Sequence, residues 1–349
     1  MDTHLFPEAG LAADDEIPHA QLADARRRTP EATPRPMTAT PILLLALALV
    51  AVPALNLLIR KGLAAPRVIE AAQPDGLPWQ AVRIPGAGGK SLFGWFIPAG
   101  ARAPAVAVLH GWGGNAEMML PLARPLHEAG FALLLFDARC HGRSDGDTFA
   151  SLPRFAEDLA SAVGWLCLRP EVDAGRIGVI GHSVGAGAAL LMAAHDTAVA
   201  SVVSLAAFAH PATVMRRWLR SMHLPHYPLG AYILWYVQRT IGRRFDDIAP
   251  SHTIGLIRCP VLLVHGTDDQ VVPADDARAI HARRRDDRTR LLLLPGGHDD
   301  SGQLEGAMGE IIDFLNRALT PVSLHPDVVP ANGHQDTLTL STREFTPNE

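Results

Sequence analysis

Ser183 has the surroundings of a nucleophilic serine. It is the central residue of the pentapeptide GHSVG (181–185), which follows the β-rich run RIGVIG (176–181) and precedes a helix-forming stretch of small residues (185–195). A serine at such a turn takes an unusual backbone conformation that raises its hydroxyl above the sheet, and flanking glycines relieve the crowding. Free N–H groups at the start of the helix suit an oxyanion. The pentapeptide therefore predicts that Ser183 is a catalytic nucleophile.

A second glycine-rich segment, HGWGGN (110–115), ends the run AVAVLH (105–110). Its glycines allow the backbone to fold closely around a small ligand group. The backbone N–H groups of Trp112 and Val184 are the natural pair of oxyanion donors beside Ser183. The alternative is an ordinary glycine-rich connection between a strand and a helix.

Ser183 needs a base, and the base needs an orienting carboxylate, because a hydroxyl near its normal pKa is a poor nucleophile. His298 follows the run LLLLPGG and lies in a loop before the last amphipathic helix, where an imidazole can reach over the sheet edge. His281 lies in a helical stretch among arginines and is expected to be solvated. Asp268 and Asp269 come shortly after the apolar run VLLVH. One of these two carboxylates is the expected orienting acid.

Apolar and β-branched residues gather in eight short runs, and helix-forming stretches separate most of the later ones. The runs cover residues 81–85, 92–97, 105–110, 131–137, 176–181, 201–205, 261–265 and 290–294, and the helical stretches 116–129, 154–168, 185–195, 274–284 and 303–318. This alternation after two initial strands predicts an α/β fold, with a mostly parallel eight-stranded sheet and helices on both faces. Ligands of such folds bind at the carboxyl ends of the strands.

Five motifs together resemble those of the α/β-hydrolase superfamily over about residues 80–319. They are LHGWGGN, FDARCHGRSDG, GHSVGAG, HGTDDQVVP and PGGHDD, with the chain order Ser, Asp, His. The similarity is to the bacterial serine-dependent branch, which includes carboxylesterases, monoacylglycerol lipase-like enzymes and serine aminopeptidase-like enzymes. The resemblance implies an α/β-hydrolase fold and a triad of Ser183, Asp269 and His298, because the acid of this branch precedes the VVP-type segment by the spacing of Asp269. Serine in the elbow argues against the branches that use aspartate or cysteine there.

Cys140 departs from the family pattern, because it stands where the D-x-R-G-H-G motif usually has glycine. The loop 137–146 is therefore expected to have altered geometry, and no role is carried over to Arg139 or His141. The three cysteines are far apart and are expected to be reduced. The sequence has no HxxxH or HExxH pair, so we expect no metal and no cofactor. A net charge of −5 with mixed signs argues against nucleic-acid binding.

The N-terminal region contains a segment suited to a membrane. Residues 42–59 carry no charge and are long enough, at about 1.5 Å per residue, to cross a hydrocarbon core. A signal-peptide core or a buried helix is the alternative, since Pro53 and Asn56 weaken the span. The expected parts of the chain are a disordered segment at 1–40, a transmembrane anchor at 41–61, a catalytic domain at 66–319 and a disordered tail at 320–349.

Basic residues flank the expected anchor on both sides, which leaves its orientation open. If translation begins at Met37, only the cluster of Arg60, Lys61 and Arg67 remains near the span. Such a start would leave the catalytic domain in the cytoplasm.

An excursion at about 207–256, between the sixth and seventh expected strands, is expected to form a small helical cap that roofs an apolar site. It holds all three tyrosines, and six arginines against only Asp246 and Asp247. Amphipathic helices are expected within 212–224 and 229–245. The arginines suit an anionic membrane surface, or a clamp on a substrate carboxylate or phosphate. The alternative is a solvated polar face on a packed lid.

These features predict an enzyme that cleaves carboxylic (acyl) esters through an acyl-enzyme intermediate. The expected partners are a small-molecule or lipid-like acyl ester and, through residues 42–59, a membrane. The alternatives are a peptidase, amidase or acyltransferase with the same triad, or a non-catalytic scaffold tethered to a membrane.

Overall fold

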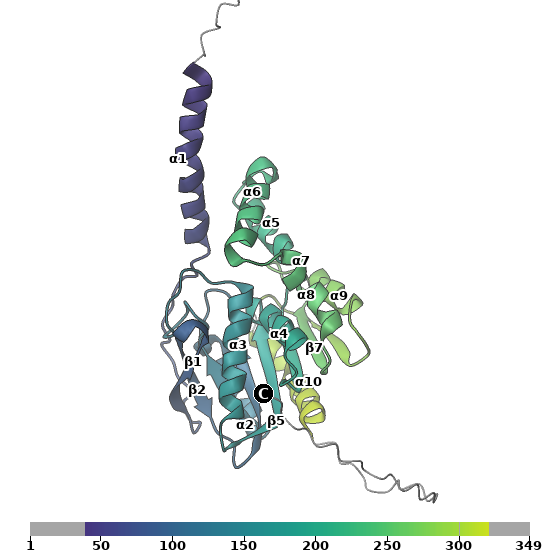
Figure 1. Ribbon diagram of the computed structural model, residues 1–349. Coiled ribbons are helices and arrows are strands. Elements are labelled where there is room, and N and C mark those ends of the chain that lie inside the picture. The colour runs from purple at the N-terminus through teal and green to yellow at the C-terminus, as the bar shows by residue number, and fades with distance from the viewer. Residues whose placement is uncertain (1–38, 300, 321–349) are drawn as a thin grey trace, which may run out of the picture. The chain divides into compact units, whose positions relative to one another are not determined.

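The computed structural model describes residues 39–299 and 301–320 of the chain (Figure 1). The chain divides into two compact units, the first ending at Ala54 and the second beginning at Leu55. The disorder expected at 1–40 and 320–349 falls almost entirely outside the described residues.

The first unit consists, in its described part, of the N-terminal two thirds of helix α1 (Ala39–Gly62). The helix continues through Pro53, has no acidic residue in its first turn and ends on Arg60 and Lys61. Its apolar side chains are exposed from Ile42 to Val52. An exposed helix of this length and composition could cross a membrane, as the sequence predicts.

The second unit is built on one sheet of eight strands in the order β1-β2-β4-β3-β5-β6-β7-β8. The strands are β1 (Gln80–Pro85), β2 (Ser91–Ile97), β3 (Ala103–Leu109), β4 (Ala132–Phe136), β5 (Val172–His182), β6 (Ser201–Leu205), β7 (Val261–Gly266) and β8 (Thr289–Leu294). β2 is antiparallel to β1 and β4, and all other neighbours are parallel. Each predicted run forms one strand, so the predicted mostly parallel sheet is confirmed.

Helices cover both faces of the sheet (Figure 1). One face packs against α3 (Leu152–Cys167), α4 (Val184–His195) and α9 (Ala274–Ala282), and the other against η2 (Ala116–Leu122), α2 (Ala123–Glu128) and α10 (Ser301–Leu319). The strands are buried on both sides, which explains why their sequences are continuous apolar runs. A short turn, η1 (Ala87–Gly89), joins β1 to β2.

A cap of short helices follows β6. It consists of α5 (Pro211–Ser221), η3 (His226–Gly230), α6 (Ala231–Ile241), α7 (Phe245–Ile248), α8 (Pro250–Thr253) and η4 (Ile254–Leu256). The single helix predicted over 229–245 is wrong at its end. α6 stops at Ile241 because Gly242 takes a left-handed conformation, with φ 69°, and closes the helix.

The cap is joined to the body of the second unit by a bidentate ion pair. Arg217 on α5 donates from its two terminal nitrogens to the Asp276 carboxylate at 2.5 and 3.1 Å. The hydrogen bonds and charge of Asp276 raise the pKa of the Arg217 guanidinium. Asp276 is in the first turn of α9, directly after the loop that carries Asp269. The pair therefore fixes α5 beside that loop.

Candidate active site

Ser183 lies at the turn between β5, one of the two central strands, and α4. Its backbone has φ 53° and ψ −113°, a conformation that non-glycine residues rarely adopt. The Ser183 N–H donates to the Leu205 carbonyl at 2.8 Å, which ties this turn to the end of β6. A Cβ at Gly181 would clash with the Gly185 carbonyl. The two glycines therefore allow strand and helix to approach closely enough to form the turn.

His298 bridges Ser183 and Asp269. Its Nδ1 lies 2.7 Å from Asp269 Oδ2, and its Nε2 lies 3.0 Å from Ser183 Oγ. A carboxylate only accepts hydrogen bonds, so the proton of the neutral ring is on Nδ1 and Nε2 is left to accept from the serine hydroxyl. The structure thus brings together the three side chains that the sequence picked out, in the hydrogen-bonded order that a nucleophile, base and orienting acid require.

Asp269, and not Asp268, makes the contact with His298. The Asp269 carboxylate is buried, and its Oδ1 accepts the N–H groups of Val271 at 2.8 Å and Val272 at 2.7 Å. These two bonds hold Oδ1 away from the imidazole and turn Oδ2 toward it. Asp268 is exposed, and its backbone and carboxylate bond to Gly296 instead. The two neighbouring acids thus separate into one that bonds to His298 and one that joins the two loops.

The loop after β3 passes directly over the Ser183 turn. A Cβ at Gly111 would lie 3.2 Å from the Ser183 Cβ, a tight contact that glycine avoids in this approach. Val184 is the first residue of α4, and its N–H has no partner within the helix. The Trp112 N–H likewise has no hydrogen-bond partner within 39–299 and 301–320. Neither predicted oxyanion donor is therefore used in a backbone hydrogen bond within the described residues.

Two buried histidines that the sequence reasoning did not assign support this loop. His141 Nε2 accepts the Gly113 N–H at 3.1 Å, and His110 Nε2 accepts the Ala138 N–H at 3.1 Å. Burial lowers the pKa of both rings, that of His110 to about 3, so both are neutral. Their positions in the sequence could have indicated them. His110 directly follows the carboxyl end of β3, and His141 comes shortly after the carboxyl end of β4.

Cys140 takes the left-handed conformation, with φ 69°, that suits the glycine usual in the family motif. Its sulfur accepts a hydrogen bond from the Asp147 N–H at 3.2 Å, which holds the side chain within the loop. The neighbouring Arg139 points away from the triad and pairs with Asp158 on α3 at 2.7 Å. The cysteine therefore occupies a glycine-like position without contacting Ser183, and all three cysteines of the chain are free thiols.

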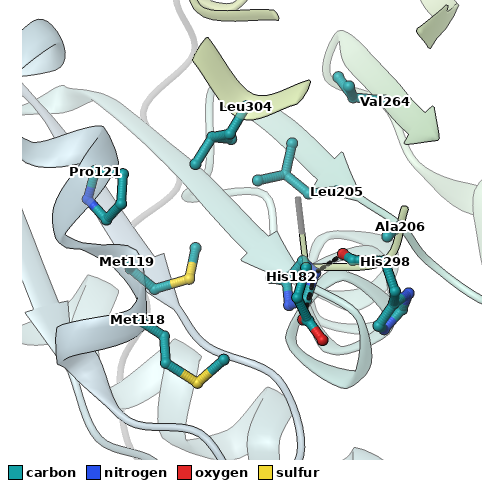
Figure 2. Close-up of a pocket in the computed structure, with 10 residues that line it drawn as sticks. Met118, Met119, Pro121, His182, Leu205, Ala206, Val264, His298 and Leu304 are labelled. Atoms are coloured by element: carbon teal, nitrogen blue, oxygen red, sulfur yellow. Dashed lines mark hydrogen bonds and ion pairs between the residues drawn. The ribbon is translucent and has the colours of Figure 1, made fainter. Parts of the chain in front are cut away.

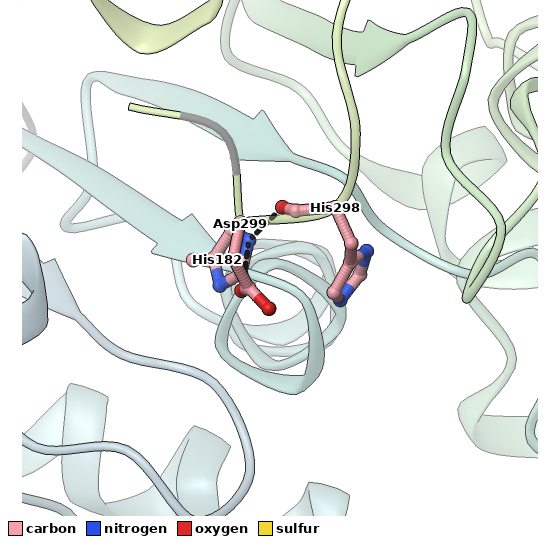
Figure 3. Close-up of side chains that lie close together, drawn as sticks. All are labelled: His182, His298 and Asp299. Atoms are coloured by element: carbon pink, nitrogen blue, oxygen red, sulfur yellow. Dashed lines mark hydrogen bonds and ion pairs between the residues drawn. The ribbon is translucent and has the colours of Figure 1, made fainter. Parts of the chain in front are cut away.

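His182, His298 and Asp299 lie close enough together to suggest a metal site (Figure 3). His182 Nε2, however, donates to the His298 carbonyl at 2.9 Å, and both ring nitrogens of His298 are engaged by Ser183 and Asp269. Burial lowers the pKa of His182, which keeps it neutral. His182 therefore has a different role, because its hydrogen bond to the His298 carbonyl fixes the backbone of the loop that carries His298.

An apolar cavity of about 110 Å³ borders His298 (Figure 2). Its lining is Met118, Met119, Pro121, His182, Leu205, Ala206, Val264, His298, Asp299 and Leu304. Met118 and Met119 come from η2 and Leu304 from α10, and all three line the cavity with the two histidines. Within the described residues, none of the lining belongs to the cap at 207–256. The expectation that the cap roofs the apolar site is thus not met for this cavity.

The fold and the serine turn are those of a known family. Residues 104–224 match the family model of the alpha/beta hydrolase fold. The uncharacterized protein Rv2307c of Mycobacterium tuberculosis is 31% identical over 239 residues, which cover 68% of this chain and 77% of that protein. The chain belongs to the α/β-hydrolase family.

Two further comparisons agree with this assignment. The uncharacterized protein YfhR of Escherichia coli K12 is 28% identical over 261 residues, which cover 71% of this chain and 84% of that protein. The solved structure of the Pyrococcus furiosus esterase Pf2001 superposes with a TM-score of 0.61 at 24% identity and covers 73% of this chain and all (100%) of that one. The second likeness is one of fold.

Proposed function

We propose that this chain is a serine hydrolase that cleaves carboxylic (acyl) esters through an acyl-enzyme intermediate. The observation that carries the proposal is the bridging position of His298, 3.0 Å from the Ser183 hydroxyl and 2.7 Å from the Asp269 carboxylate. A serine becomes a useful nucleophile when a base within hydrogen-bond reach takes its proton and a carboxylate stabilises the imidazolium.

In the first step Ser183 Oγ attacks the ester carbonyl while His298 Nε2 takes the hydroxyl proton. The carbonyl oxygen becomes an oxyanion, which the N–H groups of Trp112 and Val184 stabilise. His298 then gives its proton to the leaving alkoxide, and the alcohol departs. In the second step His298 removes a proton from water, which attacks the acyl-enzyme; the bond to Ser183 Oγ then breaks, His298 returns its proton to Oγ, and the acid is released. This chemistry requires no cofactor.

The surroundings of His298 support an ester with an apolar part. The cavity beside it is lined mainly by methionine and aliphatic side chains from η2, α10 and the ends of β6 and β7. Methionine side chains adapt their shape, so such a lining accepts acyl groups of varied form. The small volume of about 110 Å³ favours a short acyl or alcohol group in this cavity.

We also propose that α1 anchors the enzyme in a membrane. Its uncharged stretch 42–59 is exposed along most of its length, and Arg60 and Lys61 follow directly. Burying this apolar surface in lipid is favourable, and basic residues at the end of a span remain in the headgroup region.

The test of the ester activity is Ser183→Ala on p-nitrophenyl acyl esters of increasing chain length. We expect turnover to fall to about 1% of wild type or less, because no other group on the chain replaces the nucleophile. Ser161→Ala on the surface of α3, where the hydroxyl bonds only to the Glu157 carbonyl, is the matched control. A fluorophosphonate probe should label wild type and fail on Ser183→Ala. Retention of more than a few per cent of turnover would refute the assignment, while faster cleavage of aminoacyl anilides than of esters would assign an amidase.

A further inference from the structure

Helix α6 gathers aromatic side chains on the face opposite its buried residues. Ile233, Leu234 and Val237 are buried in the core. The opposite face presents Tyr232, Trp235, Tyr236 and Arg239, at the i, i+3, i+4 and i+7 spacing of one helical face. The rings of Tyr232 and Tyr236 stack at 6.2 Å with an interplanar angle of 11°. Such a band of tyrosine, tryptophan and arginine is typical of the boundary between lipid and water.

This aromatic face bonds to the last turns of α1. Tyr232 donates its hydroxyl proton to Asn56 Oδ1 at 2.8 Å, and Arg60 Nε donates to the Tyr236 hydroxyl at 2.9 Å. Each helix advances four residues between the two bonds, so α6 and this part of α1 run in the same direction. Following α6 backwards from Tyr236 past Tyr232 therefore leads the same way as following α1 backwards from Arg60 into its apolar stretch.

The segment reached by going backwards from Tyr232 is the turn between α5 and α6. Exposed apolar and aromatic side chains lie in this turn and on the two helices that it joins. Tyr227 is 78% exposed, Trp218 is 53% exposed, Met222 is 51% exposed and Trp235 is 56% exposed. We call these four residues the cap tip. Single exposed apolar residues are ordinary, but four within the short stretch 218–235 of the cap call for an apolar partner.

The charge around the cap tip has one sign. Residues 211–245 contain six arginines and no aspartate or glutamate, although the whole chain has a net charge of −5. Arg217 pairs with Asp276 and Arg244 with Asp246. For Arg216, Arg220, Arg239 and Arg243, all exposed, no acidic partner is found in the part of the chain that the structure describes. Basic residues around an exposed apolar tip complement an anionic lipid surface.

We infer that the cap tip is embedded in the headgroup region of an anionic bilayer, with α6 held against the end of the α1 anchor by Asn56 and Arg60. The inference rests on the membrane anchoring proposed above. Tyr232 lies at the level of Asn56, near the end of the apolar stretch, and Trp218, Met222 and Tyr227 of the cap tip precede it along the chain. The consequence is that the lid next to the Asp269 loop contacts lipid directly. The substrates that fit such a lid are acyl esters already dissolved in the bilayer.

The test uses tryptophan fluorescence of the full chain in lipid nanodiscs whose acyl chains carry bromine, which quenches only fluorophores that touch lipid. Discs of zwitterionic lipid are compared with discs containing anionic phosphatidylglycerol. We expect Trp218→Phe/Trp235→Phe to lose quenching by about twofold or more relative to wild type. Trp165→Phe is the matched control. Trp165 lies at the far end of α3 from Ala150, whose N–H bonds to the Leu63 carbonyl just after α1.

Quenching of wild type should be stronger in discs that contain anionic lipid than in zwitterionic discs. The variant Arg216→Gln/Arg220→Gln should be quenched equally in both. Equal quenching of wild type and the double tryptophan variant would overturn the inference, as would failure of the chain to remain with the discs. If protection of the cap tip from quenching depends on the number of chains per disc, the cap tip is instead covered by a second copy of the protein. Labelling of Ser183 by a fluorophosphonate in the same discs reports the proposed chemistry separately. Failure of the proposed chemistry can therefore be distinguished from failure of the lipid contact.

Discussion

Replacing Asp269 by asparagine should reverse the hydrogen bonding of His298 while changing few atoms. Asp269 Oδ1 accepts two backbone N–H groups, at 2.8 and 2.7 Å. The asparagine oxygen must take this position, because an amide NH₂ group cannot accept from N–H donors. The NH₂ group then faces His298 Nδ1 and donates to it. The ring proton moves to Nε2, which can no longer accept the proton of Ser183.

The cost of this reversal follows from the chemistry of the first step. A base held in the wrong tautomer lowers kcat by about 10⁴-fold, or about 5 kcal/mol in barrier height. KM should change little, since Asp269 is buried beneath His298 and away from the substrate. The free energy of unfolding should change by less than about 1 kcal/mol, because both N–H bonds to the side-chain oxygen are kept.

The assay is steady-state hydrolysis of a p-nitrophenyl ester, with thermal unfolding as the check on folding. Asp268→Asn is the matched control, because its carboxylate accepts only from Gly296 and Thr267 and an amide oxygen can replace it. We expect this variant to stay within about threefold of wild-type kcat. If Asp269→Asn keeps more than about a tenth of wild-type kcat, or if Asp268→Asn loses as much, the assignment of the orienting acid is wrong.

Three other changes probe the frame around the triad. Gly185→Ala places a methyl group against a backbone carbonyl of the loop after β3 and should destabilise the fold by about 3 kcal/mol in urea unfolding. The control Gly164→Ala, on the open surface of α3, should stabilise the fold by about 0.5–1 kcal/mol. Burial, with Glu70 alongside, raises the pKa of Asp137 from 3.8 to about 8. The folded chain therefore keeps a proton that the unfolded chain loses, so stability present at about pH 4 is lost as the pH rises through about 8. Tm should fall over this range in wild type and stay flatter in Glu70→Gln; a parallel decline in both would contradict this origin. His141→Leu leaves a loop N–H without its acceptor and should lower both Tm and kcat, by about 1–3 kcal/mol in each free energy, with unchanged activity as the refuting result.

The sequence predicted the sheet well, and it singled out three side chains that the structure brings together, because both inferences use local patterns. Strands buried on both faces require continuous apolar runs, and those runs are visible without knowledge of the fold. Ser183 and His298 were singled out because each occupies a loop at the carboxyl end of a strand. The choice between Asp268 and Asp269 rested on a family resemblance, since it depends on which carboxylate the N–H groups of Val271 and Val272 capture.

What the sequence did not reveal depends on contacts between distant segments. His110 and His141 support the oxyanion loop through backbone atoms up to 28 residues away, and no periodicity indicates such a bond. The second cap helix was drawn too long because Gly242 was read as part of an amphipathic pattern rather than as its end. The contribution of η2 and α10 to the apolar lining was not predicted, because these two elements meet beside His298 only in the folded sheet.

The bonds from Tyr232 and Tyr236 to α1 bear on how a shortened form of this chain, prepared without the proposed anchor, would behave. Asn56 and Arg60 belong to the stretch that is cut away first when a soluble version of an anchored enzyme is made. Without them, two phenol groups lose their partners, and α6 is held to the rest of the molecule by its buried residues and by the Arg217–Asp276 pair of the cap, without the two bonds to α1. Kinetics measured on such a shortened chain would describe a different lid, even with Ser183, Asp269 and His298 intact.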